Sequence, residues 1–327
     1  MNEEQSPQVT IIVPCYNVGK FLPQCLDSLI HQTYENIRIL AVDDVSPDNS
    51  AQVIREYEQK DPRVKGIFHQ VNSGVSVARN SGIAELNSPW VFFLDGDDWL
   101  EADTISRMLE TQKRANADIV CCNMLECNED GTENGRVEYP QQGLHTLQFD
   151  EGLEDVLEHQ GVLCVCTAKL FRSSLILETG IRFDERLRHA QDTLFTHTVV
   201  LQNRPRVVMD YDHCGYRYRQ FGNSCVHAIP LDKRLGYIEI LVTELDGLAM
   251  RLGYSRRLAV RKAAEYFWGI RKFSKDNVER RRRVEEVVSK RFFHEHLYPI
   301  LSQFGKWKHR MLLRLMSRGH TGWIRYW

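Results

Sequence analysis

The 327-residue sequence lacks an apolar run of about 18 residues, the length that a membrane-spanning helix needs. It also lacks the basic and then apolar start of a secretory signal, because Met1 to Gln5 are acidic and polar. Neither a membrane span nor export is indicated, and we expect a cytoplasmic protein. The formal net charge of −2 excludes little, since a basic carboxyl-terminal fifth offsets acids that concentrate earlier in the chain.

Signs of disulfide pairing and of structural zinc are absent as well. The nine cysteines are an odd number, and several fall inside expected strands and helices. Cys164-Val165-Cys166 has neither the paired spacing nor the histidine partners of a zinc site. The sequence therefore predicts reduced thiols, buried as small hydrophobic groups.

The first expected strand, Val9 to Val13, stops at Pro14 and is not followed by a glycine fingerprint. A dinucleotide-binding turn needs G-x-G-x-x-G at this point, and the chain has Pro14-Cys15-Tyr16-Asn17 instead. A dinucleotide-dependent oxidoreductase is disfavoured for this reason, although its sheet pattern would be similar.

The most informative stretch that is present runs from Trp90 to Trp99, where an apolar run ends in Asp95, Asp97 and Asp98. Uninterrupted apolar residues predict a strand buried on both faces of a parallel sheet. Acids at its carboxyl end would lie in the crevice where open α/β sheets bind ligands. Their mutual repulsion favours a bound magnesium or manganese ion. An acidic turn that caps the next helix explains the same residues equally well at this point.

Strands alternate with helices over the first part of the chain. Strands are expected over residues 9–13, 37–42, 64–68, 90–94 and 117–124, and helices from about Phe21, after Ser50, over 75–83 and over 104–115. Such alternation produces right-handed crossovers and a mainly parallel sheet, so the predicted fold class is α/β.

The later pattern is less regular. Residues 126–143 are predicted as a polar excursion, 148–159 and 191–201 as helices, 163–171 as a strand or buried segment, and 207–209 and 215–219 as late strands. From Leu231 to the end the spacing is helical. We therefore predict a larger domain over residues 1–229 and a smaller, helical region over residues 230–327.

Six motifs in this order resemble glycosyltransferase family 2, and the resemblance covers roughly the first 225 residues. The motifs are Ile11 to Asn17, Cys25 to Leu29 with Gln32-Thr33-Tyr34, Val42-Asp43-Asp44 with Ser46 and Asp48, Gly74 to Gly82, Phe93 to Trp99, and Asp192 to Phe195. The segment Tyr216-Arg217-Tyr218-Arg219 with Ser224 is similar to a late family element. The resemblance implies a GT-A fold for residues 1–229 and an enzyme that uses a nucleotide sugar.

The resemblance also implies a nucleotide site at the ends of the first strands. Pro14 and Tyr16 would lie beside the base, usually uracil, and an aromatic ring offers the flat base a stacking face. Asp44 would accept a hydrogen bond from the base imide N–H.

The acids after the fourth strand are implied to hold the sugar and the metal. Asp95 would lie near the ribose and the donor sugar, and Asp97 together with Asp95 would bind Mn²⁺ or Mg²⁺. Asp98 would support these ligands through hydrogen bonds. For Arg79 two roles stay open, because it could contact the base or neutralise the strand-end acids.

Asp192 matches the catalytic base of the family. In an inverting displacement this carboxylate takes the proton of the acceptor hydroxyl on the face opposite the leaving diphosphate. Arg217 or Arg219 would help the metal stabilise the charge on that diphosphate. The residue before the base is usually Glu and is Gln191 here, which alters the expected hydrogen bonding. On its own, Asp192 is better explained as an acid favoured by a helix dipole.

Three histidines and the carboxyl-terminal segment complete the candidates. His189, His213 and His227 are candidates for a third metal ligand or an acceptor contact, although a lone histidine is more often structural. Basic and aromatic residues alternate from Lys306 to Trp327, which suits an anionic membrane surface. Packing against the same protein or a dimer partner explains this pattern equally well. A nucleic-acid partner is disfavoured, because no binding module is recognisable.

The resulting prediction is a metal-dependent, inverting glycosyltransferase that moves a sugar from a nucleotide donor, expected to be UDP-linked. The acceptor would be a hydroxyl of a surface glycan or glycolipid in bacterial polysaccharide assembly. Peripheral contact with the cytoplasmic face of the inner membrane is the accompanying hypothesis. The alternative is a catalytically inactive glycan-binding or scaffold protein that kept the fold.

Overall fold

The structure, a computed structural model, describes residues 9–150, 153–220 and 229–259 together with residues 262, 282 and 286. The chain forms two compact units, one over residues 1–147 and 159–224 and one over residues 148–158 and 225–327. The basic and aromatic segment from Lys306 and the candidate ligand His227 lie outside the described residues.

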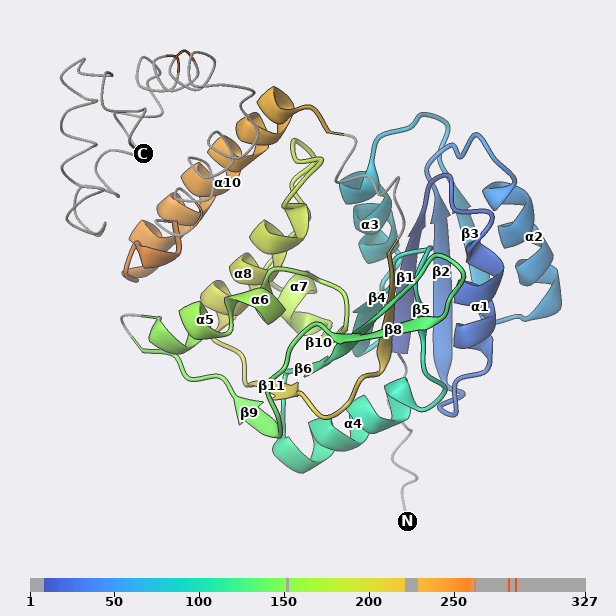
Figure 1. The fold of residues 1–327 in the computed structure, drawn as a ribbon, viewed down its shortest axis with the longest axis horizontal. Coiled ribbons are helices and arrows are strands. Elements are labelled where there is room, and N and C mark those ends of the chain that lie inside the picture. The colour runs from blue at the N-terminus through green and yellow to red at the C-terminus, as the bar shows by residue number, and fades with distance from the viewer. Residues whose placement is uncertain are drawn as a thin grey trace. The chain divides into compact units, whose positions relative to one another are not determined.

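The first unit is built on an eight-stranded sheet with the strand order β3-β2-β1-β4-β10-β6-β11-β9 (Figure 1). The strands are β1 Val9–Cys15, β2 Ile37–Asp43, β3 Val64–Phe68, β4 Trp90–Phe93, β6 Ile119–Cys122, β9 Leu144–Thr146, β10 Lys169–Arg172 and β11 Val207–Asp210. β1 to β4 pair in parallel, whereas β10 runs antiparallel to both β4 and β6. The predicted α/β fold with a mainly parallel sheet is confirmed.

The strand order reverses at β1. The chain steps from β1 through β2 to β3 and then returns to place β4 on the other side of β1. The helices of this unit are α1 Leu22–Ile30, α2 Ser50–Lys60, α3 Val75–Ala84, α4 Thr104–Ala115, α6 Gln160–Leu163, α7 Ser174–Leu177 and α8 Gln191–Asn203. α1 buries Leu22, Cys25, Leu26 and Leu29 as predicted, while Ile30 at its end is only half-buried.

α3 packs unusually close to β1. A Cβ on Gly82 would lie 2.5 Å from Ile12 Cγ2, so only glycine allows this approach. The helix is therefore held against β1 in a fixed position, and it carries Arg79.

β1 is longer than predicted, because it continues through Pro14 to Cys15. Pairing with β4 ends where Ile12 lies opposite Phe93, while pairing with β2 continues to Cys15. The Ile12 carbonyl accepts from the Leu94 amide on the β4 side. Pro14 lies two residues after Ile12, so its backbone nitrogen also faces the β4 side. Pairing with β4 has already ended there, and the missing N–H of proline costs no hydrogen bond.

The single strand predicted over residues 117–124 is wrong, because Asn123 divides it into β6 and β7. Its Nδ2 donates to the carbonyls of Tyr139 and Tyr211 at 2.7 and 2.8 Å, and its Oδ1 accepts from the amides of Met124 and Tyr139. β7 begins a second sheet with the order β5-β12-β7-β8. Its strands are β5 Trp99–Leu100, β7 Met124–Cys127, β8 Glu133–Val137 and β12 Tyr216–Arg219, so part of the predicted excursion is also strand.

The second unit contains α5 Glu154–Glu158 and α10 Leu231–Leu252. The helix predicted over 148–159 is thus shorter, and the Asp150 carboxylate accepts from the Glu154 amide at its start. The apolar face predicted for α10 is buried: Leu235, Ile238, Leu241, Val242, Leu245 and Leu248. None of the described helices combines the length and the apolar character that crossing a bilayer requires.

Candidate functional site

The carboxyl ends of β1, β2 and β4 are tied together at one edge of the sheet. The Asp44 amide donates to the Cys15 carbonyl at 2.9 Å, and the Leu94 amide donates to the Ile12 carbonyl at 3.1 Å. Because the strand order reverses between β1 and β4, this edge is where an open α/β sheet leaves room for a ligand.

Arg79 joins two of the predicted site acids at this edge. Its Nη1 donates to Asp192 Oδ1 at 2.6 Å, and its Nη2 donates to Asp95 Oδ1 at 2.7 Å. The arginine is 2% exposed, and its guanidinium carbon lies 5.2 Å from the centre of the Phe183 ring. Of the two roles open for Arg79, the structure shows the neutralisation of strand-end acids.

Phe183, the ring that Arg79 contacts, belongs to a cluster of four phenylalanines. The rings of Phe183 and Phe195 stack with centroids 3.9 Å apart, and Phe93 meets both of them edge-on. Phe171 completes the cluster against Phe93 and Phe195. Rigid packing of these rings fixes the position of the guanidinium, and hence the positions of the two carboxylates that it binds.

Asp192 lies in the first turn of α8. Ala190, two residues earlier, has a φ of 61°, a strained conformation for a residue with a Cβ. No described residue donates a hydrogen bond to the second Asp192 oxygen, and the side chain is 19% exposed. Burial raises the pKa of Asp192, and Arg79 partly offsets that effect. A free oxygen on a carboxylate made more basic by burial has the properties of a general base.

The carboxylate of Asp97 accepts no hydrogen bond from any other described residue. Burial and the nearby charge of Asp95 raise its pKa to about 6. Gly96 allows the tight turn between these acids, because a Cβ there would meet the Pro14 carbonyl at 3.2 Å. A hard anionic oxygen that lacks a cation fits Mg²⁺ or Mn²⁺, so Asp97 and Asp95 are suited to hold such an ion.

Asp98, in contrast, is a structural acid. Its Oδ2 accepts from the Tyr216 hydroxyl at 2.5 Å, and its Oδ1 accepts from the Arg219 amide at 2.8 Å. Both donors lie in β12, so Asp98 fastens the acidic turn to the second sheet.

Asp44 is enclosed by donors of the protein itself. Its Oδ1 interacts with His69 Nδ1 at 2.8 Å, and its Oδ2 accepts from the Gly74 amide at 2.6 Å. The Ser73 amide lies 3.0 and 3.1 Å from the two oxygens. These hydrogen bonds hold the pKa of Asp44 below its usual value despite burial. The structure thus shows protein donors around the carboxylate that was expected to receive a base, while Tyr16 nearby is 48% exposed.

A family model described as glycosyl transferase family 2 matches residues 10–180, just over half of the chain. The chain belongs to glycosyltransferase family 2. The family expected from the six motifs is therefore confirmed.

Curated relatives and solved structures agree with this family 2 assignment. The chain is 33% identical over 223 residues to the uncharacterized glycosyltransferase EpsJ of Bacillus subtilis, which covers 67% of the chain and 62% of EpsJ. It is 41% identical over 260 residues to glycosyltransferase GlyA of Streptococcus pneumoniae, covering 77% of the chain but 36% of GlyA. A poly(ribitol-phosphate) beta-glucosyltransferase of Bacillus spizizenii is 29% identical over 73% of the chain and 37% of its own length. The chain thus spans less than two thirds of the length of these relatives.

Among solved structures, S. aureus TarS 1-349 in complex with UDP-GlcNAc has a TM-score of 0.73 at 20% identity, covering 97% of the chain and 89% of the TarS 1-349 chain. The mannosyltransferase PcManGT from Pyrobaculum calidifontis, in complex with GDP-Man and Mn²⁺, has a TM-score of 0.52 at 15% identity, covering 99% of the chain and 87% of PcManGT. At these identities the likeness shows a shared fold.

Arg217 and Arg219, which the family 2 resemblance places at the diphosphate, both have partners within the protein. Arg217 pairs with Glu101 and Glu133 at 2.9 and 3.2 Å. Arg219 donates to the carbonyls of Asp97 and Glu129 and to Gln24 Oε1, and it is 5% exposed. These contacts hold the second sheet and the acidic turn in place, and the expected role of both arginines at the diphosphate stays a prediction.

Sequence reasoning missed two residues near the acids of this family 2 site. Tyr218 is 37% exposed, and burial together with the charges of Asp98 and Asp95 raises its pKa. The period-2 alternation with Tyr216 along β12 could have indicated that both rings share a face. Lys169, buried at the start of β10, carries no sequence signal because it stands in an apolar run.

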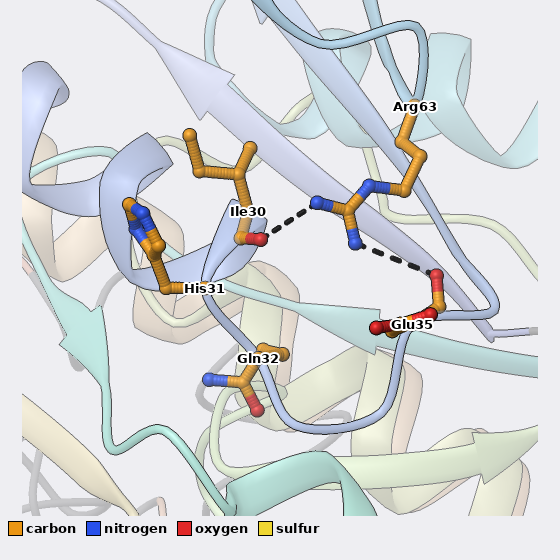
Figure 2. A pocket seen from close by; sticks show the side chains of 5 residues that line it. All are labelled: Ile30, His31, Gln32, Glu35 and Arg63. Atoms are coloured by element: carbon orange, nitrogen blue, oxygen red, sulfur yellow. Dashed lines mark hydrogen bonds between the residues drawn. The ribbon is translucent and has the colours of Figure 1, made fainter.

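A polar cavity lies at the opposite end of the strands from these acids, between the end of α1 and the start of β3. Figure 2 shows Arg63 directed at the carbonyls of Ile30 and Glu35, to which it donates at 2.6 and 3.4 Å. Gln32 and His31 complete its lining. Arg63 and Gln32 are both held by hydrogen bonds to the protein, so we assign this cavity no part in the chemistry.

His213 and His189 are the candidate histidines that the structure describes, and His213 shows no interaction with the site acids. His213 is 3% exposed, and burial lowers its pKa, with Arg107 as the next cause. The charged groups that affect it are Arg107, Asp210, Asp103 and Arg217, none of which is a site acid. His189 is half-buried in the loop before α8, and no metal contact is assigned to it.

Proposed function

We propose that this chain is a metal-dependent, inverting glycosyltransferase with Asp192 as the base, which transfers a sugar from a UDP-linked donor to a hydroxyl of a cell-surface glycan. The observation that carries the proposal is the Arg79 bridge. The Arg79 guanidinium donates to one oxygen of Asp192 and to one oxygen of Asp95, and no described residue donates to the second Asp192 oxygen. Residues 1–229 would form the catalytic domain and residues 230–327 an accessory helical region.

The reaction follows from this geometry. The free Asp192 oxygen accepts the proton of the acceptor hydroxyl while that hydroxyl attacks C1 of the donor sugar. The bond from C1 to the diphosphate breaks on the opposite face, and its electron pair leaves with the diphosphate. A Mn²⁺ or Mg²⁺ ion at Asp97 and Asp95 would neutralise the charge that develops there. Arg79 orients Asp192 throughout.

The comparisons support the donor and acceptor classes. TarS was solved with UDP and with UDP-GlcNAc, and PcManGT with a nucleotide sugar and Mn²⁺. The relatives include a poly(ribitol-phosphate) beta-glucosyltransferase and a minor teichoic acid biosynthesis protein, GgaB, of Bacillus subtilis. An extended, hydroxyl-rich surface polymer is thus the acceptor class we favour. Pro14 and Tyr16 are the residues we propose for the base.

Calorimetric titration with UDP, with Mn²⁺ and with EDTA, tests the proposal. We expect binding that weakens at least tenfold when the metal is removed, as about 1.4 kcal/mol of lost interaction would cause. Hydrolysis of a panel of UDP-, GDP- and TDP-sugars would then identify the donor. A protein that binds no UDP and hydrolyses none of these sugars would be the inactive glycan-binding scaffold instead.

The contact with the membrane is a separate part of the proposal, supported by the basic and aromatic pattern from Lys306 to Trp327. Flotation of the full chain with phosphatidylglycerol vesicles and with phosphatidylcholine vesicles tests it. Recovery with the anionic vesicles alone is expected, and equal recovery in both would refute the contact.

A further inference from the structure

Val45, in the loop that follows β2, has a backbone conformation that valine rarely adopts. Its φ is 61°, in the left-handed region, where the Cβ of an ordinary residue crowds the following carbonyl oxygen. It is the one β-branched residue among the described non-glycine residues with a positive φ, and the others are Asn17, Asn116, Leu153, Ala168, Ala190 and Arg204. This conformation costs free energy that some other contact must offset.

Hydrogen bonds hold the peptide groups on both sides of Val45. The Asp44 carbonyl accepts from Asn72 Nδ2 at 2.8 Å, and the Ser46 amide donates to Asp43 Oδ2 at 3.3 Å. A strained conformation persists where its surroundings fix it in this way, and such residues are frequent where ligands bind. The direction of the Val45 side chain is therefore set by the fold.

Burial does not offset the cost of this conformation. The Val45 side chain is 41% exposed, whereas Leu153 and Ala168, which share the left-handed conformation, are 0% and 1% exposed. An apolar side chain stabilises a fold only through the area that it removes from water, and glycine would adopt this φ without strain. Folding stability thus does not explain a valine here, whereas a contact with a ligand does.

Two more apolar side chains are exposed on the neighbouring loops. Tyr16, directly after β1, is 48% exposed, and Val71, after β3, is 70% exposed. The Asn17 amide donates to Ser46 Oγ at 3.2 Å, which ties the first loop to that of Val45, and the hydrogen bond to the Asp44 carbonyl ties the third loop to it. Because β1, β2 and β3 pair in parallel, the three apolar groups gather at the carboxyl edge of the sheet.

The strand order sets these apolar groups beside the acids expected to bind the metal. In the order β3-β2-β1-β4, the apolar groups follow the first three strands, and Asp95 and Asp97 follow β4. β2 and β4 are both neighbours of β1, so their ends lie two strand spacings apart, about 10 Å. A nucleoside diphosphate has the same polarity, because the ribose separates its flat base from the charged diphosphate. The loops after β1, β2 and β3 therefore suit the base.

We propose that Val45 is a binding residue for the base of the nucleotide donor, and that its exposed side chain packs against the uracil of bound UDP. This inference rests on the proposed function, in which the donor is UDP-linked, and it adds Val45 to Pro14 and Tyr16. The strained backbone and the β-branched side chain fix the position of the isopropyl group before the ligand arrives, so little conformational entropy is lost on binding. Uracil covers the apolar surface that folding leaves exposed.

The test compares Val45→Gly with Val45→Ile and with Asn116→Gly. Glycine removes the side chain and the strain together, whereas isoleucine keeps both. Asn116 is a matched control, because it is exposed, has a φ of 48° and ends α4 before the amino end of β6, away from the carboxyl edge.

For Val45→Gly we expect the Kd for UDP in calorimetric titration to rise about fivefold to tenfold. The factor should be the same with Mn²⁺ and with EDTA, because contact with the base does not involve the metal. The Tm of Val45→Gly should equal or exceed that of the parent, since the strain is relieved. Val45→Ile and Asn116→Gly should each change the Kd less than about twofold.

Each outcome decides the inference. Parental UDP affinity in Val45→Gly overturns it, and so does a loss of affinity together with a lower Tm, which would show a role in folding. An equal loss in Val45→Ile also overturns it. If Val45→Gly does not fold, Val45→Asn, which tolerates the left-handed region, should show the same loss, and failure of both to fold refutes the strain argument. A parent that binds UDP equally with Mn²⁺ and with EDTA, but loses affinity in Val45→Gly, would refute only the proposed metal.

Discussion

Charged side chains lie at both ends of the eight-stranded sheet, and the two ends differ in how they treat a carboxylate: Asp61 is paired, whereas the Asp97 carboxylate has no partner among the described residues. At the Arg63 end, Asp61 receives three contacts from this arginine, which hold its pKa below the usual value. At the Asp97 end, burial and a neighbouring acid raise the pKa to about 6. A paired carboxylate stabilises the fold, whereas an unpaired one costs free energy. The end that keeps an unpaired carboxylate is therefore the end at which we expect a ligand to bind.

The same contrast holds for two buried amides. Gln32, at the Arg63 end, donates to the carbonyls of Ser28 and Glu101 and accepts from the Ile105 amide. Gln191, beside the base, has a buried Oε1 without a partner. An unsatisfied buried oxygen costs free energy, and such costs are common where residues serve chemistry, as we propose for this edge of the sheet.

The largest expected effect is on sugar transfer, which we expect to depend on an acid at one end of the sheet and not on an acid at the other end. Asp192→Asn should lower sugar transfer by about 10²- to 10⁴-fold, because the general base is removed while its shape remains. UDP affinity should be unchanged in titration calorimetry. Asp61→Asn, at the other end, is the control and should keep its turnover. Unaltered turnover in Asp192→Asn would show that another group takes the proton.

The two glutamines predict opposite changes in stability. Gln32→Leu should lower the free energy of unfolding by about 2–4 kcal/mol, because it leaves two carbonyls and one amide without partners. Gln191→Leu should be neutral or gain about 1 kcal/mol, because it removes an unsatisfied oxygen. Urea unfolding of both variants measures the difference. Equal losses would mean that the Gln191 side chain is satisfied in solution.

Asp97 and Asp61 predict a smaller difference in the free energy of unfolding. In EDTA, Asp97→Asn should raise the free energy of unfolding by about 1–2 kcal/mol, since an uncompensated charge is removed. Asp61→Asn should lower it by about 1 kcal/mol, because the partner of Arg63 is lost. With Mn²⁺ and UDP present, Asp97→Asn should lose the ligand-induced rise in Tm that the parent shows. A parent and variant with equal rises would argue against a metal at Asp97.

The smallest expected effect is a pH dependence of stability in the metal-free protein. Asp97 has a raised pKa, so the folded state binds its proton first, and stability should increase by about 1–2 kcal/mol as pH falls from 7 to 5. Asp61 and Asp44 have lowered pKa values, so their contribution should be lost below about pH 4. Asp97→Asn should remove the first change alone. An identical slope in the variant would assign the proton uptake to another group.

Local sequence patterns predicted the first and last residues of several helices and strands correctly. The strand over 64–68 and the helix over 104–115 were expected where β3 and α4 lie, because period and punctuation are properties of neighbouring residues. The break at Asn123 could not be predicted, since its side chain is satisfied by Tyr139 and Tyr211, which are 16 and 88 residues away. Similarly, the contacts of Arg217 with Glu101 and of Arg219 with Gln24 could not be predicted, because these partners come from distant segments.

The sequence by itself determined the alternation of strands and helices, the family, and the acids that end β2 and β4, because all of these are written in short motifs. Only the tertiary structure decided that Arg79 joins Asp95 to Asp192, which lies 113 positions from Arg79 in the sequence. Pairing between distant charges depends on burial and on which strand ends meet. Neither is encoded in local spacing, since both follow from the order in which the strands assemble into the sheet.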